Sequence, residues 1–190
     1  MRISGGIARG IELHVPRGDA VRPATDGMRQ SVFSSLAARI PGSRFVDLFA
    51  GSGAYGLEAF SRGASGGTFV ERSAKALSCL RRNIDAVSKS VGRDSGLLAA
   101  VEADALSVPT GVGEPPDLIF VDPPYEAIPE VAPVLFSKLS AALPADWPGL
   151  VVFEMPGEAV VEPVGWTCLK RLGRGARNPS VAFFARARPA

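Results

Sequence analysis

The sequence predicts an α/β fold with a mainly parallel sheet, helices on both of its faces and an antiparallel pair of strands at one edge. Two features of the 190-residue chain lead to this prediction. From residue 45 onward, short apolar runs alternate with helix-like stretches, and continuous apolar runs are typical of parallel strands buried on both faces. The connection between the last two runs is too short for a helix, so these two strands are expected to form an antiparallel hairpin.

The predicted elements follow one another in a regular order. Strands are expected at residues 45–49, 67–70, 97–101, 118–121, 150–154, 167–172 and 181–185, and helices at 54–62, 73–87 and 133–143. Pro133 suits the first turn of the last helix, where its missing N–H is not needed. Residues 173–180, which are rich in glycine and arginine, are expected to form the hairpin loop.

Residues 1–44 are expected to form an N-terminal arm, a short hairpin plus a helix, packed on a main domain of residues 45–190. Isoleucines, leucine and valine in residues 3–15 stand among glycines and arginines. Thr25 or Asp26 can cap a helix that runs to about Arg39. The arm has too little apolar surface for a core of its own, so we do not expect it to fold separately.

Charge is distributed unevenly although the net charge is only +2. Residues 1–44 hold seven arginines and three acids, residues 45–165 eight basic and sixteen acidic residues, and residues 166–190 six basic residues and no acid. Basic ends around an acidic middle suit a nucleic-acid-facing rim beside a cofactor pocket, or ordinary solvated faces. Without a membrane-length apolar run, an apolar signal core or a CxxC pair, the chain is expected to be cytoplasmic, with packed, reduced thiols, no membrane and no metal.

A glycine-rich turn follows the first predicted strand. Residues 51–56 read Gly-Ser-Gly-Ala-Tyr-Gly, and glycines there let a ligand approach the backbone ahead of a helix N-terminus. Asp47, four residues before the first glycine, would attract the amino group of a methionine tail and repel a pyrophosphate, which favours S-adenosylmethionine over a dinucleotide. Glu71 can accept both ribose hydroxyls, and Asp104 can accept from an adenine amino group.

The predicted cofactor-binding residues are Asp47, Phe49, Ala50, Gly51, Ser52, Gly53, Gly56, Glu71, Arg72, Asp104 and Ala105. Purely structural alternatives remain for the three acids. Asp47 could cap a turn, Glu71 could be a solvated acid at a strand end, and Asp104 could cap the segment that follows it.

A stiff acidic corner follows the fourth strand. Prolines fix φ, lack a donor and hold the preceding residue extended, so the corner offers free carbonyls and a carboxylate to an –NH₂ group. An aromatic side chain beside them can stack on the flat ring of a base that has been splayed out of its own stack. We expect catalysis by alignment and desolvation, because the only histidine, His14, lies in the arm. The alternative is a plain strand-ending turn. The predicted catalytic residues are Asp122, Pro123, Pro124 and Tyr125.

These segments resemble the RsmD family of bacterial 16S rRNA guanine-N2 methyltransferases. The resemblance rests on residues 47–59, 61–64 and 122–125, and on the opening residues 2–6, 9–10, 16, 22–26, 29 and 33. It implies a seven-stranded Rossmann-like class I S-adenosylmethionine-dependent methyltransferase fold and S-adenosylmethionine as the methyl donor. It also implies a guanine N2 of the guanine-966 class as the target, with 16S rRNA or the assembling small ribosomal subunit as the partner.

The arm departs from the family pattern Arg-Pro-Thr-x-Asp-Arg-x-Arg-Glu at Ala24, Gly27 and Gln30. Other interpretations remain open: methylation of adenine N6, cytosine N4 or a glutamine amide, or a catalytically silent RNA-binding protein. A dehydrogenase is disfavoured by Asp47 and by the proline corner. The predicted RNA-binding residues are Arg9, Arg22, Arg29, Arg174 and Arg177.

Overall fold

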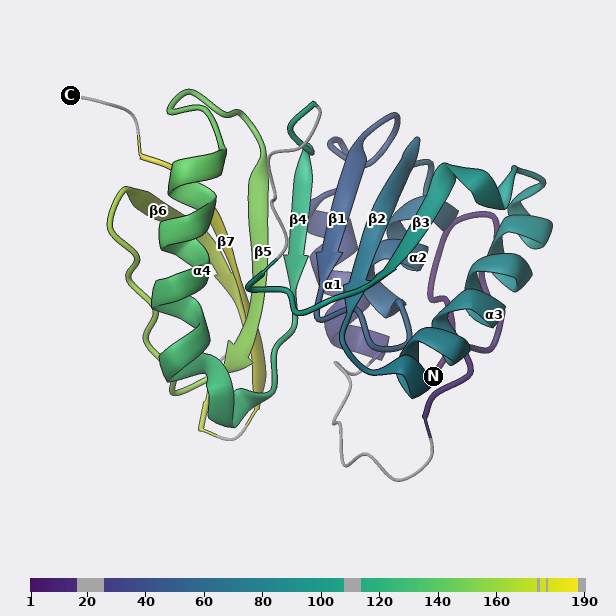
Figure 1. Ribbon diagram of the computed structural model, residues 1–190, viewed down its shortest axis with the longest axis horizontal. Coiled ribbons are helices and arrows are strands. Elements are labelled where there is room, and N and C mark those ends of the chain that lie inside the picture. Colours follow the sequence, from purple (N-terminus) through teal and green to yellow (C-terminus); the bar gives the residue numbers. More distant parts are fainter. Residues whose placement is uncertain (17–25, 108–113, 174, 177, 188–190) are drawn as a thin grey trace.

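The computed structural model describes residues 1–16, 26–107, 114–173, 175–176 and 178–187. Within them, a seven-stranded sheet has the order β3-β2-β1-β4-β5-β7-β6 (Figure 1). The first five strands are parallel, and β7 runs antiparallel between β5 and β6. This confirms the predicted parallel sheet with an antiparallel edge. The strands are β1 (Arg44–Leu48), β2 (Gly66–Glu71), β3 (Leu98–Glu102), β4 (Leu118–Val121), β5 (Leu150–Pro156), β6 (Trp166–Leu172) and β7 (Pro179–Arg186).

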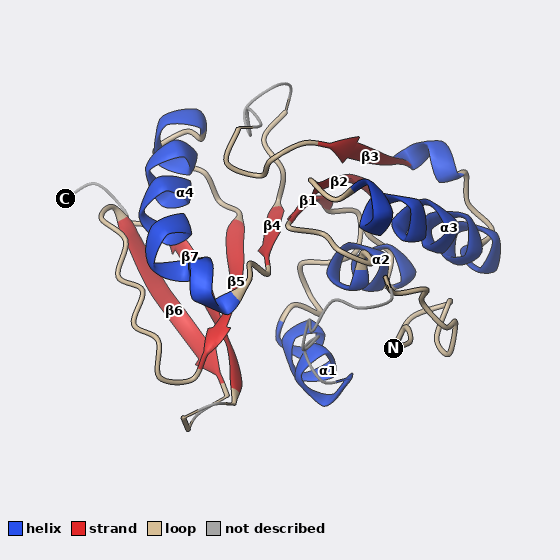
Figure 2. Cartoon of the chain, turned by 60° about the horizontal axis from the view of Figure 1, so that its bottom comes forward, coloured by secondary structure: helices blue, strands red, loops and turns tan. Residues whose placement is uncertain are grey.

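Helices cover both faces of the sheet, as Figure 2 shows. Helices α1, α2 and α3 share one buried cluster with side chains such as Phe45 and Phe120, and α4 shares the other with Ile119 and Phe153. Burial on both sides explains why the strands read as continuous apolar runs. The helices are α1 (Asp26–Ser35), α2 (Ala54–Ser61), α3 (Ala74–Val91) and α4 (Ile128–Ala142), with short 3₁₀ turns η1 (Ser95–Leu97) and η2 (Tyr125–Ala127).

Three local predictions were wrong. Helix α4 starts at Ile128, so Pro133 lies inside it and Pro129 occupies the first turn. The helix begins earlier because Ile128 and its neighbours pack on the sheet, and that burial outweighs the one backbone donor lost at Pro133. Helix α1 ends at Ser35 rather than near Arg39. Cys168 is a free, exposed thiol on β6 rather than a packed one.

The N-terminal residues form a minimal hairpin that packs on α2. A single antiparallel bridge joins Arg2 to Glu12. The Glu58 carboxylate, which is fully buried, accepts from both the backbone N–H and the hydroxyl of Ser4, at 2.7 and 2.8 Å. Ile3 and Leu13 join the same buried cluster as α1 and α2, so these two side chains of the hairpin are part of the main core.

The strand order reverses between β1 and β4, and this reversal creates the crevice in which open α/β sheets bind ligands. Leu48 pairs in register with Val121, so the turn after β1 and the corner after β4 begin side by side. The chain then continues to α2 on one face of the sheet and to α4 on the other (Figure 2). The two segments therefore diverge and leave space between them.

Gly56 in α2 is a packing position, and we predict that Gly56→Ala destabilises the protein by about 1–3 kcal/mol. A Cβ there would lie 2.4 Å from the Phe69 ring and 2.5 Å from the Phe45 ring. Gly27→Ala in α1 is the matched control, because a Cβ there meets nothing within 4 Å and alanine favours the helix by up to about 1 kcal/mol. Urea unfolding of both variants checks the difference, and equal effects would contradict it.

Candidate active site

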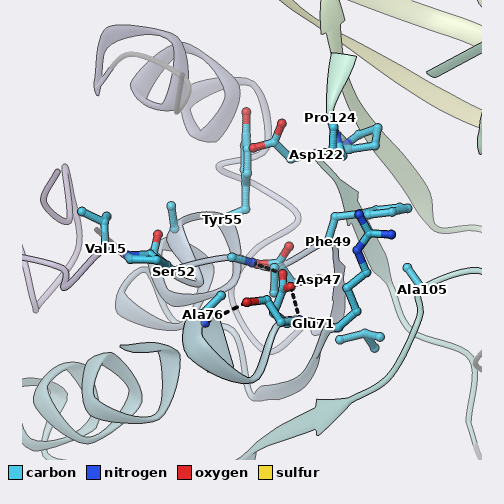
Figure 3. A pocket seen from close by; sticks show the side chains of 18 of the residues that line it. Val15, Asp47, Phe49, Ser52, Tyr55, Glu71, Ala76, Ala105, Asp122 and Pro124 are labelled. Carbon is cyan, nitrogen blue, oxygen red and sulfur yellow. Dashed lines mark hydrogen bonds between the residues drawn. The ribbon is translucent and has the colours of Figure 1, made fainter. Parts of the chain in front are cut away.

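A cavity of about 1050 Å³ lies at the crevice (Figure 3). The turn after β1 and the corner after β4 both face it, which is the arrangement on which the predicted chemistry depends. In Figure 3, Tyr55 and Asp122 stand together at one end and Glu71 lies toward the other. The predicted catalytic and cofactor-binding residues that line the cavity are Asp47, Phe49, Ala50, Gly51, Ser52, Glu71, Arg72, Ala105, Asp122, Pro123, Pro124 and Tyr125.

The turn after β1 is shaped by left-handed backbone at Phe49 (φ 61°), Gly51 (φ 53°) and Gly53 (φ 81°). A Cβ at Gly51 would meet nothing within 4 Å, so glycine there keeps cavity space open for a ligand. Gly53 and Gly56 do not line the cavity. A Cβ at Gly53 would lie 2.4 Å from a Leu80 methyl group, so these two glycines serve the packing of α2 instead.

Two carboxylates fix the shape of this turn. Glu71, at the end of β2, accepts hydrogen bonds from the backbone N–H groups of Gly51 and Ser73, each at 2.8 Å. Asp47, which is 2% exposed, accepts from the Gly56 N–H at 2.9 Å. Burial raises the pKa of Asp47 to about 8; the negative charge of Glu71 adds to this rise and the Gly56 N–H opposes it.

The corner after β4 adjoins a buried hydrogen-bonded cluster that the sequence did not reveal. Glu154 on β5, which is 1% exposed, accepts from the Tyr55 hydroxyl at 2.7 Å and from the Tyr125 hydroxyl at 3.3 Å. Burial raises the pKa of Glu154, whereas the two tyrosine hydrogen bonds and the charge of Arg29 lower it. Burial also raises the pKa of Asp122, reinforced by the charges of Glu154 and Asp47.

A signal for Glu154 was present in the sequence. It ends the apolar run 150–154, and an acid inside a strand buried on both faces requires a partner. Tyr55 carried no separate signal, because it occupies a variable position of the glycine motif. It lies in the first turn of α2, and burial raises the pKa of its hydroxyl, reinforced by the charges of Glu154 and Asp122.

Other predicted residues lie elsewhere. Asp104 is exposed and accepts from the Leu106 N–H at 2.7 Å, so it does not line the cavity and instead stabilises the segment after β3. Arg9 is exposed. Arg29 is 1% exposed and lines the cavity. The predicted RNA contacts Arg22, Arg174 and Arg177 lie outside the described residues.

Two further properties concern the described ranges only. No helix there is both long and apolar enough to cross a bilayer. No group of three or more His, Cys, Asp or Glu side chains there is arranged to hold a metal ion.

The strand order, the switch point and the glycine turn define a Rossmann-like fold of the class I methyltransferase type. The chain belongs to the family described as Conserved hypothetical protein 95, whose model matches residues 1–179. The resemblance to the RsmD family is thereby confirmed, because curated relatives carry the name "Ribosomal RNA small subunit methyltransferase D".

Two of these relatives and two solved structures illustrate the similarity. The Escherichia coli K12 relative is 38% identical over 125 residues, which are 66% of this chain and 60% of that protein. The Haemophilus influenzae relative is 30% identical and covers 92% of this chain and 89% of its own length. The solved Escherichia coli protein yhhF is 28% identical, with a TM-score of 0.80, and the alignment covers 98% of this chain and 97% of the yhhF chain. SMU.776, solved with SAH, is 15% identical, with a TM-score of 0.64. The alignment covers 83% of this chain and 49% of the SMU.776 chain, and it shows the fold alone.

The matched region thus spans less than two thirds of the Escherichia coli K12 relative.

Asp47 should make the free energy of unfolding depend on pH. Its pKa is about 8 in the folded protein and 3.8 in an unfolded chain, so the folded state holds the proton between these values. The stability from this proton is fully present below about pH 3.8 and is lost as the pH rises through about 8, with a slope of at most about 1.4 kcal/mol per pH unit. Asp47→Asn, which keeps an acceptor for Gly56, should flatten this slope and raise stability at about pH 8.

Urea unfolding across this pH range measures the effect. Asp85→Asn, which changes an exposed acid on α3, is the matched control and should keep the wild-type slope. If Asp47→Asn also keeps that slope, Asp47 does not hold the proton.

Proposed function

We propose that this protein transfers a methyl group from S-adenosylmethionine to the exocyclic N2 amine of a guanine in 16S rRNA. The observation that carries the proposal is the single cavity shared by the glycine turn after β1 and the acidic proline corner after β4. The names of the family relatives support rRNA as the substrate. Free 16S rRNA or the assembling small ribosomal subunit would be the partner, and the reaction would take place in the cytoplasm.

The residues around the turn fit the methyl donor. Gly51 leaves open space where the backbone borders the cavity. Glu71 uses each carboxylate oxygen for one backbone bond and retains lone pairs for ribose hydroxyls. Asp47 offers its carboxyl group to the amino group of the methionine moiety, whose positive charge would favour the ionised form of Asp47. S-adenosylmethionine, when bound, supplies an electrophilic methyl group on a sulfonium sulfur.

The corner would orient the acceptor. The Asp122 carboxylate and the carbonyls of the two prolines can accept the hydrogens of an exocyclic amine, which turns its lone pair toward the donor. In the transfer, the sulfonium S–C bond would break as the N–C bond forms, S-adenosylhomocysteine would leave, and the amine would lose one proton, which Asp122 is placed to take. Burial raises the pKa of this carboxyl, and the positive charge of a bound donor would favour its ionised form, which is the form able to take the proton. Tyr125, held by Glu154, offers a ring for stacking of the base.

The test of this function is transfer of labelled methyl groups from S-adenosylmethionine to 16S rRNA and to small subunits from a strain that lacks the homologous enzyme. Nucleoside analysis should find N2-methylguanosine. N6-methyladenosine or N4-methylcytidine would instead identify one of the alternative amine targets. Absence of transfer to any of these acceptors, from a protein that binds the donor, would refute the proposal.

Asp122→Asn should lower the methyl transfer rate by about 10²–10⁴-fold, because the substituted side chain cannot take the amine's proton. S-adenosylhomocysteine affinity, measured by calorimetry, should stay within about twofold of the wild type. Glu130→Gln, an exposed acid in the first turn of α4, is the control and should leave both quantities unchanged. Loss of S-adenosylhomocysteine affinity in Asp122→Asn would show that Asp122 acts on the donor instead.

Glu71→Ala should weaken S-adenosylhomocysteine binding by about tenfold or more, since the ribose loses an acceptor and Gly51 loses the bond that holds the turn. The control is Glu102→Ala, which removes an exposed acid at the end of the neighbouring strand β3. Calorimetric titration of both variants measures the difference. An unchanged dissociation constant for Glu71→Ala would remove Glu71 from the donor site.

A further inference from the structure

Arg29 is a buried cation with unused donors. It lies in α1, its side chain is 1% exposed, and it lines the cavity. Its Nη2 donates to the Arg2 carbonyl and to the Asp26 carboxylate, each at 2.6 Å. Its Nε and Nη1 have no hydrogen-bond partner among the described residues. The guanidinium is thus fixed at one nitrogen and keeps three N–H donors on the other two.

Donors left unpaired in the interior are costly, and an arginine in this state is suited to bind an oxyanion. Glu154 accepts from Tyr55 and Tyr125 but makes no hydrogen bond to these Arg29 donors. Arg29 lines the same cavity as Tyr55. Burial raises the pKa of Tyr55 and of Glu154, and the charge of Arg29 opposes both rises.

We propose that Arg29 binds an oxyanion in this cavity, and that the oxyanion is the carboxylate of the methyl donor's methionine moiety. This inference rests on the function proposed above. The methionine moiety carries one ammonium and one carboxylate, and Asp47 suits the ammonium. Among the described residues, Arg29 and Arg72 are the arginines that line the cavity, and Arg72 directly follows Glu71 at the ribose end. Arg29 is therefore the arginine placed to receive the carboxylate.

The other source of an oxyanion is a phosphate of the target RNA. A polymeric backbone needs an accessible cation, and Arg29 is 1% exposed. A carboxylate on a small ligand that enters the cavity meets this restriction more easily. The burial of Arg29 thus favours the donor over the RNA as the source.

The test compares two small ligands with the intact protein. S-adenosylhomocysteine carries the amino-acid carboxylate, and 5′-methylthioadenosine shares the nucleoside and the thioether but lacks the amino-acid part. In Arg29→Gln, calorimetry should find S-adenosylhomocysteine binding weakened by about ten- to hundredfold, as expected for a charge-assisted hydrogen bond. The affinity for 5′-methylthioadenosine should stay within about twofold, and Arg29→Lys should lie between Arg29→Gln and the wild type.

Arg93→Gln is the matched control. Arg93 is also partly buried and also donates to backbone carbonyls, those of Ala64 and Ser65, but it does not line the cavity. This variant should bind both ligands as the wild type does. Retained binding of 5′-methylthioadenosine also serves as the folding check for Arg29→Gln.

Two results would overturn the inference. Equal weakening of both ligands in Arg29→Gln would mean that Arg29 only shapes the cavity. Unchanged S-adenosylhomocysteine affinity, together with a salt dependence of 16S rRNA binding that is shallower by about one unit, would assign the oxyanion to an RNA phosphate. Both leave the proposed function standing, whereas a wild-type protein that binds neither small ligand would contradict the proposed function itself.

Discussion

The in-register pairing of β1 with β4 determines that the glycine turn and the proline corner lie beside each other. Leu48 stands beside Val121, so the chain leaves the sheet at neighbouring points and immediately diverges to opposite faces. Asp47 and Asp122 are thereby brought to the same crevice although they are far apart in sequence. A shift of one residue in this pairing would turn the side chains of one strand to the other face of the sheet. It would also separate the glycine turn from the proline corner.

The same crevice gathers three acidic side chains in a poorly solvated place. Burial raises the pKa of Asp47, Asp122 and Glu154, and the charges of Glu154 and Asp47 add to the effect at Asp122. Hydrogen bonds from two tyrosines and the nearby charge of Arg29 partly offset this at Glu154. A cavity with such an electrostatic character suits a cationic ligand, because a positive charge relieves the repulsion among the carboxylates.

Much of the architecture could be predicted because its signals are local. Continuous apolar runs gave the parallel strands, and the glycine motif between a strand and a helix gave the cavity wall. Helix α4 was predicted to start too late because Pro133 looked like a first-turn residue, whereas burial of Ile128 extends the helix. Glu154 and Arg29 could not be placed in the site from the sequence, because their partners come from other elements and only the packed fold brings them together.

At Phe49, protein stability and the shape of the cavity make opposite demands on the residue. Its left-handed backbone is costly for a residue with a Cβ, by roughly 1–3 kcal/mol, yet its ring forms part of the cavity wall. A glycine there would relieve the strain and remove that ring at the same time. Phe49→Gly would therefore raise thermal stability by relieving backbone strain. The same substitution would expose the cavity, and a ligand bound in it, to water.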